Sequence, residues 1–204
     1  MNMDITQQMY NGIAEKYTKN WKKLNVTGQF RKKFIRYVKK GKIADIGCGP
    51  GISTNYFSKK FHVVGIDSSE EMIKIAKKRF RLEFILADMR KMRFEENSLN
   101  GAWVSQSLHH IPKKECIMVL RKIKKYLKND GVLFISVREG SFEGFTDKSK
   151  NEIFSGRKRF VAMYTEDELN EILSSLNYKV IEVSKVRRSL DIEPYINVFA
   201  RNIK

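Results

Sequence analysis

Short apolar segments that alternate with amphipathic ones most constrain what this chain can fold into. Lys42–Ile46, His62–Asp67 and 132–137 have the length of strands and are bounded by glycine or acidic residues. Between such segments lie others, such as 113–128, whose apolar side chains recur every three to four residues, as in an amphipathic helix. This alternation predicts an α/β fold with a mainly parallel sheet covered by helices on both faces.

The remaining elements follow the same two patterns. We expect helices over 4–18, 26–40 and 52–59, strands over 82–86 and 101–106, a turn at 129–131, an irregular excursion over 139–160 and a closing pair of strands over 178–186 and 195–200. Ser68 with Glu71 and Thr165 with Glu168 have the spacing of capping boxes, so each pair predicts the start of a helix.

Length and composition restrict the class of protein. The chain has 204 residues, enough for one well-buried domain, and its longest apolar runs are far shorter than the roughly 20 residues of a membrane-spanning helix. Its start lacks the basic and apolar regions of a secretory signal. Two cysteines, Cys48 and Cys116, are too few for a disulfide framework or, alone, for a structural zinc site. We expect a soluble, cytoplasmic protein without membrane insertion.

The chain is strongly basic, with 40 Lys and Arg against 23 Asp and Glu and a net charge of +17. Such a charge favours an anionic partner, for example nucleic acid or an acidic substrate. A generally lysine-rich composition explains the charge as well, since 27 of the 40 basic residues are scattered lysines and arginine is the usual residue for bidentate phosphate recognition. Both interpretations stay open at this point.

A glycine-rich turn follows the strand Lys42–Ile46. Gly47, Gly49 and Gly51 allow a sharp turn and a close approach of a ligand to the backbone. Their spacing differs from the G-x-G-x-x-G fingerprint of dinucleotide-binding folds. Asp45 precedes the turn, and its carboxylate is a poor neighbour for a pyrophosphate and a good one for a cation. Both features argue against the alternative of a nicotinamide-dependent oxidoreductase.

Acidic residues also end the next two strands. Asp67 stands where an acid binds a ribose diol, with Ser68 beside it and Met72 one turn into the next helix, placed for an adenine face or for the core. Asp88, followed by Met89, is suited to accept a hydrogen bond from an adenine amino group. Because the carboxyl ends of parallel strands meet at one edge of a sheet, these residues are expected to lie together. The pattern fits a ligand with an adenosine body and a cationic head.

Five segments resemble, in order and spacing, the motif set of the class I S-adenosylmethionine-dependent methyltransferases, in particular members that act on small molecules: 45–51 (Asp-Ile-Gly-Cys-Gly-Pro-Gly), 63–68, 86–89, 107–112 and 127–133. The resemblance implies a Rossmann-like, seven-stranded, mainly parallel sheet with an antiparallel last strand and S-adenosyl-L-methionine as the cofactor. It also implies that the loop 47–51 holds the methionine part, Asp67 the ribose, and Asp88 with Met89 the adenine.

The segment after the fourth strand carries the other residues expected near the chemistry. The resemblance implies that Ser105 and Gln106 lie beside the methionine part and the methyl group that is transferred. His109 and His110 follow them and are the candidate general bases, because imidazole titrates near physiological pH. A structural turn is the alternative reading of the two histidines. We expect no metal site, because no further His or Cys is placed to complete one.

We expect a single domain over 1–204, divided into an N-terminal helical cap over 1–40, a cofactor-binding core over 41–138, and a lid-like excursion with the closing helix and strand pair over 139–204. Aromatic residues of the cap and the excursion are candidate walls of an acceptor pocket, with ordinary packing as the alternative: Tyr10 and Tyr17 first, then Trp21, Phe142, Phe145, Phe154 and Phe160.

The leading hypothesis is transfer of a methyl group, by in-line displacement, to a small-molecule acceptor. The basic residues of the cap and the excursion favour an anionic acceptor. The alternative is an RNA methyltransferase, acting on tRNA or rRNA through the basic N-terminal helices. The sequence lacks the Pro-Pro-Tyr motif of adenine amino methyltransferases and the Pro-Cys nucleophile of cytosine C5 enzymes.

Overall fold

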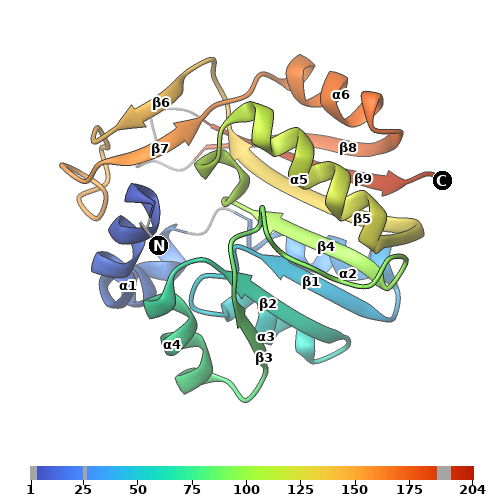
Figure 1. Ribbon diagram of the computed structural model, residues 1–204, viewed down its shortest axis with the longest axis horizontal. Helices are drawn as coiled ribbons and strands as arrows, with labels where there is room; N and C mark the ends of the chain where they lie inside the picture. The colour runs from blue at the N-terminus through green and yellow to red at the C-terminus, as the bar shows by residue number, and fades with distance from the viewer. Residues whose placement is uncertain (1–3, 25–26, 188–193) are drawn as a thin grey trace.

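A seven-stranded sheet forms the centre of the computed structural model, which describes residues 4–24, 27–187 and 194–204 (Figure 1). The strands run in the order β3-β2-β1-β4-β5-β9-β8. Strands β1 to β5 are parallel, whereas β9 lies antiparallel between β5 and β8. Their bounds are β1 Lys42–Ile46, β2 His62–Asp67, β3 Glu83–Leu86, β4 Leu99–Ser105, β5 Leu127–Arg138, β8 Tyr178–Val186 and β9 Tyr195–Asn202. The expected fold class is confirmed.

Helices cover both faces of the sheet, because each of them buries one apolar stripe. On one face, α2 (Phe30–Val38), α3 (Ile52–Ser58) and α4 (Glu70–Arg79) pack against the sheet. On the other face, α5 (Lys113–Tyr126) and α6 (Glu166–Ser175) bury theirs. Strands β1, β2 and β4 and the second half of β5 are buried on both sides and are therefore apolar almost throughout, whereas the edge strand β3 is mostly exposed.

Aromatic side chains fill the layer between α2, α3 and the sheet. Trp103 of β4 stacks on Phe134 of β5 with ring centroids 4.0 Å apart and an interplanar angle of 15°. Phe34 of α2 meets Trp103 edge-on at 5.2 Å, and Phe57 of α3 lies 5.1 Å from it. All four side chains are fully buried, so this layer fixes the strands whose ends carry the candidate site.

The N-terminal helices differ from the expectation in length and place. Helix α1 covers Ile5–Leu24 and is longer than the expected 4–18, whereas α2 begins only at Phe30. Residues 25–26, expected to open the second helix, lie outside the described residues. Helix α2 packs on a face of the sheet, so of the two N-terminal helices only α1 lies at the edge where the parallel strands end (Figure 1).

Two further expectations were wrong in detail. Ser69, not Ser68, is the N-cap of α4: its hydroxyl accepts from the backbone of Met72, because Asp67 binds the Ser69 N–H in a tight turn that shifts the helix start by one residue. The excursion 139–160 is not irregular throughout, since β6 (Glu143–Thr146) pairs with β7 (Arg159–Ala162) in a two-stranded sheet.

The capping box of Thr165 and Glu168 is present at the start of α6, as expected. The turn expected at 129–131 was wrong, because these residues belong to β5. They form an irregularity in that strand, which pairs Leu127 with Leu99 and Val132 with Gly101. Within the described ranges, no helix is both long and apolar enough to cross a membrane.

Candidate functional site

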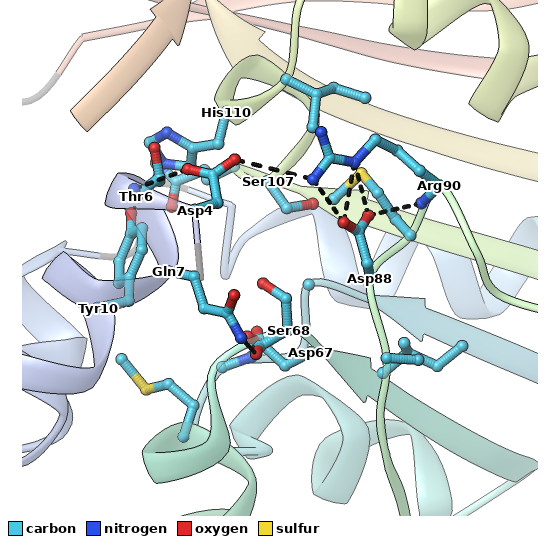
Figure 2. A pocket seen from close by; sticks show the side chains of 18 of the residues that line it. Asp4, Thr6, Gln7, Tyr10, Asp67, Ser68, Asp88, Arg90, Ser107 and His110 are labelled. Atoms are coloured by element: carbon cyan, nitrogen blue, oxygen red, sulfur yellow. Dashed lines mark hydrogen bonds and ion pairs between the residues drawn. The ribbon is translucent and has the colours of Figure 1, made fainter. Parts of the chain in front are cut away.

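A cleft opens at the carboxyl ends of β1 to β4, beneath the first turns of α1. It holds about 860 Å³, its open mouth included. We call it the acidic cleft, because three carboxylates and one guanidinium line it. Its lining consists of Asp4, Thr6, Gln7, Tyr10, Tyr17, Gly47, Gly49, Ile66, Asp67, Ser68, Met72, Ala87, Asp88, Met89, Arg90, Ser105, Gln106, Ser107, His110 and Ile111 (Figure 2). In a chain of net charge +17, this local excess of acid suits a cationic ligand.

The glycine loop after β1 forms one wall of the acidic cleft, because its backbone is not covered by side chains there. Gly47 has φ +76°, and a Cβ added to it would lie 2.2 Å from the Cβ of Ser107. Ser107 approaches this closely because its hydroxyl donates to the carbonyl of Ile46 over 2.8 Å. Gly49 also lines the cleft, whereas Gly51 does not: a Cβ there would meet the ring of Phe84, so Gly51 serves packing.

Asp45 lies outside the cleft, unlike the other acids expected at the site. Its side chain is 2% exposed and accepts a hydrogen bond of 2.7 Å from the hydroxyl of Thr54. Burial raises the pKa of Asp45 to about 7, and the hydrogen bond from Thr54 opposes this shift. The residue therefore ties the end of β1 to α3 and does not line the cleft.

Asp67 lies at the tip of β2 with both carboxylate oxygens directed by the backbone. One oxygen accepts from the N–H of Gly49 and the other from the N–H of Ser69, each over 2.8 Å. Burial raises the pKa of Asp67, and these backbone hydrogen bonds oppose the shift. A carboxylate has about four lone-pair sites, so acceptor capacity remains toward the cleft, where Ser68 and Met72 flank it.

Asp88 and Met89 also line the cleft, but a residue that the sequence did not single out holds the carboxylate of Asp88. Arg90 bonds to Asp88 at 2.5 Å and lies 3.7 Å from Asp4 (Figure 2). It also bonds to Glu115 of α5 at 2.9 Å. Burial favours the neutral acid, yet the hydrogen bonds from Arg90 outweigh it and lower the pKa of Asp88. Arg90 thus keeps this carboxylate ionised and links α1, β3 and α5.

The end of β4 brings Ser105 and Gln106 to the cleft. Gln106 has φ +57°, a conformation uncommon for a residue with a side chain, and its N–H donates to the carbonyl of Ser136. The hydroxyls of Ser105 and Thr27 lie 2.7 Å apart, so the segment that follows α1 is joined to this strand end. A strained residue of this kind commonly marks a functional site.

Tyr10 and His110 meet between the cap and the strand edge. The hydroxyl of Tyr10 lies 2.8 Å from Nε2 of His110, and Nδ1 of His110 lies 2.9 Å from the carbonyl of Phe160. A carbonyl only accepts, so Nδ1 carries the proton and Nε2 of the neutral ring accepts from Tyr10. Burial lowers the pKa of His110 to about 4, so the ring is neutral at pH 7.

The two histidines therefore differ in place. His110 lines the acidic cleft, whereas His109 lies behind it and lines an adjoining cavity instead. Tyr10 and Tyr17, the expected acceptor contacts, line both spaces. Among the described residues, no group of three or more His, Cys, Asp or Glu is placed to hold a metal ion.

Sequence reasoning missed the first turn of α1. Gln7 donates to the carbonyl of Ser68, and the hydroxyl of Thr6 accepts from the N–H of Phe160, so this turn clamps the ends of β2 and β7 together (Figure 2). A signal existed, because Gln7, Tyr10 and Tyr17 follow helical spacing on one face of α1.

The chain matches known proteins in the same core. Residues 43–131 match a family model described as a methyltransferase domain. The chain is 35% identical over 102 residues to phosphoethanolamine N-methyltransferase 1 of Arabidopsis thaliana, covering 47% of this chain and 20% of that protein. It is 29% identical over 145 residues to the ubiquinone/menaquinone biosynthesis C-methyltransferase UbiE of Campylobacter jejuni, covering 63% of this chain and 61% of that one. The match thus spans about a fifth of the length of the Arabidopsis protein and about three fifths of the length of the Campylobacter protein.

A solved structure extends the likeness to almost the whole fold. The 1,6-didemethyltoxoflavin-N1-methyltransferase of Burkholderia thailandensis, solved with 1,6-didemethyltoxoflavin and S-adenosylhomocysteine, superposes with a TM-score of 0.77 at 20% identity, over 98% of this chain and 88% of that one. The seven-stranded sheet with its antiparallel last strand, the glycine loop and the acids at successive strand ends agree with this likeness. Residues 43–131 of this chain therefore form a methyltransferase domain, and the fold built around them is similar to that of the solved S-adenosylmethionine-dependent methyltransferases.

Proposed function

We propose that this protein binds S-adenosylmethionine in the acidic cleft and transfers its methyl group to a small, anionic acceptor. The observation that carries the proposal is Asp67: a half-buried carboxylate, fixed by the backbone of the glycine loop, faces a cleft with further acids and little opposing charge. The acidic lining fits the group, because S-adenosylmethionine combines a sulfonium with an adenosine. The relatives named above, whose names refer to small molecules, support a small acceptor.

Each wall of the cleft has a distinct proposed part in binding. The remaining lone pairs of Asp67 accept from the ribose hydroxyls, Asp88 and Met89 hold the adenine, and Met72 packs beside it. The backbone of Gly47 and Gly49 leaves room for the methionine part, next to Ser105 and Gln106. Because α1 closes the cleft, its first turn excludes water from the bound ligand.

The cofactor supplies a methyl group already activated on a cationic sulfur, which leaves as a neutral thioether once the methyl is taken. The protein therefore has mainly to align the nucleophile of the acceptor and to exclude water. Where the acceptor must also lose a proton, His110 is the proposed base, with His109 behind it. Since Nε2 of His110 already accepts from Tyr10, the acceptor would have to replace that hydroxyl before its proton is taken.

Calorimetric titration of the protein with S-adenosylmethionine and S-adenosylhomocysteine tests the cofactor site. Asp67→Ala should weaken both at least about 100-fold, because two hydrogen bonds to a charged acceptor contribute roughly 3 kcal/mol together. Asp167→Ala, which changes an exposed acid at the start of α6, should bind as the wild type does. Equal dissociation constants for Asp67→Ala and the wild type would remove the assignment of the cleft.

Labelled cofactor and fractionated extract test the reaction itself. Transfer of the labelled methyl group to low-molecular-weight fractions that resist nuclease supports the proposal. Label that enters only nuclease-sensitive material would replace it with the RNA alternative.

A further inference from the structure

A second cavity adjoins the acidic cleft. It holds about 350 Å³, its open mouth included, and shares Tyr10, Tyr17, Gln106 and His110 with the cleft, so these four residues line both spaces. Two arginines are among the residues that line it, and none of its lining residues is acidic. We call this space the basic cavity.

Arg159 of β7 is held in the wall of the basic cavity as a buried cation. It is 3% exposed, and its guanidinium donates to the backbone carbonyls of Lys148, Phe154 and Arg157 over 3.0, 3.4 and 3.2 Å. These bonds occupy three of its five N–H donors and fix the plane of the group. The two other donors have no acceptor among the described residues.

Among the described residues, no carboxylate lies within salt-bridge distance of the Arg159 guanidinium. Burial lowers the pKa of Arg159, and the more distant carboxylate of Asp147 only partly opposes this shift. A buried cation without a counter-ion costs considerable free energy, so proteins seldom keep one unless a ligand supplies the opposite charge.

Arg138 adds a second cation at the same place. It ends β5, and its guanidinium lies 5.5 Å from the ring centre of Tyr195, another residue of the cavity wall. Arg138 and Arg159 repel each other, and this repulsion also lowers the pKa of Arg159. An anion bound between them would relieve both the repulsion and the burial of the charge.

We propose that the basic cavity is the acceptor subsite and that Arg159, together with Arg138, binds an oxyanion of the acceptor, a carboxylate or a phosphate. This inference rests on the proposed methyl transfer and specifies how its acceptor is recognised. With its oxyanion on the arginines, the acceptor extends toward Gln106 and His110, where the basic cavity meets the acidic cleft. The planar guanidinium suits both anions, because each offers two oxygens to a pair of N–H donors.

Binding of inorganic phosphate and of acetate to the protein loaded with S-adenosylhomocysteine tests this subsite without any knowledge of the acceptor. Saturable binding should weaken at least tenfold in Arg159→Met and in Arg138→Met. It should stay unchanged in Arg157→Met, which alters an exposed arginine two residues away. Arg159→Lys keeps the positive charge but loses the planar guanidinium. Its affinity for the anions should lie between those of the wild type and Arg159→Met.

The two anions separate the sources of the charge: tighter phosphate binding points to a phosphorylated acceptor, and tighter acetate binding to a carboxylic acid. If Arg159→Met does not fold, since its guanidinium also braces 148–157, Arg138→Met decides. Absence of saturable binding in the wild type, or equal binding in the foldable variants, would overturn the inference. Binding of S-adenosylhomocysteine is measured on the same samples. If it is retained while anion binding is absent, the acceptor subsite is wrong and the cofactor site is not.

Discussion

His110 should give the protein a stability that falls as the pH is lowered. Its ring is half-buried, with Nδ1 bonded to the carbonyl of Phe160 and Nε2 to the hydroxyl of Tyr10. Burial lowers the pKa of this group to about 4, from about 6.5 in the unfolded chain. Since the unfolded state binds the proton more tightly, the free energy of unfolding decreases below pH 6.5 and goes on decreasing until about pH 4.

The size of the effect follows from these two values. Between pH 7 and pH 5 the unfolded state gains most of a proton while the folded state gains little, which corresponds to a loss of about 2 kcal/mol. For a domain of this length, that loss lowers the midpoint of thermal unfolding by about 4–8 °C.

Thermal and urea unfolding of three proteins at pH 5, 6 and 7 isolates this contribution. In His110→Gln the side chain no longer titrates. Between pH 7 and pH 5, the free energy of unfolding of this variant should therefore decrease by about 2 kcal/mol less than that of the wild type. His62→Gln is the matched control, because the side chain of His62 is 64% exposed, and it should follow the wild type. The three proteins have the same carboxylates, so the contributions of these groups to the pH dependence cancel in the comparison. Parallel pH profiles for the wild type and His110→Gln would refute the reasoning.

Three further predictions concern the structure around the site. Gly47→Ala should destabilise the protein by about 2–5 kcal/mol through left-handed strain and the clash with Ser107, and Ser107→Gly should restore part of this in equilibrium unfolding of the double variant. Thr165→Ala removes the N-cap of α6 and should cost about 1 kcal/mol, with cofactor affinity by calorimetry unchanged. Burial raises the pKa of the thiols of Cys48 and Cys116, the latter to about 11, so a thiol reagent at pH 8 should modify them slowly unless denaturant is added. Rapid modification of the native protein would contradict that burial.

The sheet and the strand ends could be predicted because they depend on patterns that are local in sequence. A strand buried on both faces needs an apolar run, and a turn with φ near +76° at Gly47 needs a residue without a side chain. Asp67 could be placed at the cleft for the same reason, since it directly ends such a run. The capping box at Thr165 is equally local.

The interactions that escaped prediction join segments far apart in the chain. Asp45 stands in the expected motif position, yet packing against Thr54 turns it away from the cleft. Arg90 reaches a carboxylate two residues away but also one on α5, which spacing alone does not reveal. Arg159 lines a cavity whose walls come from α1, β5 and β7, so its place could be known only after these elements have packed together.

Six of the nine residues that line the basic cavity lie outside the segment that matches the methyltransferase domain. That segment covers 43–131, whereas Arg138, Phe154, Arg159 and Tyr195 come after it and Tyr10 and Tyr17 before it. With the proposed acceptor subsite there, substitutions in these flanking parts would change which molecule is methylated while the cofactor site remains intact. Paralogues with nearly the same core would then diverge in substrate choice first, through a few exchanges on α1, β7 and the end of β5.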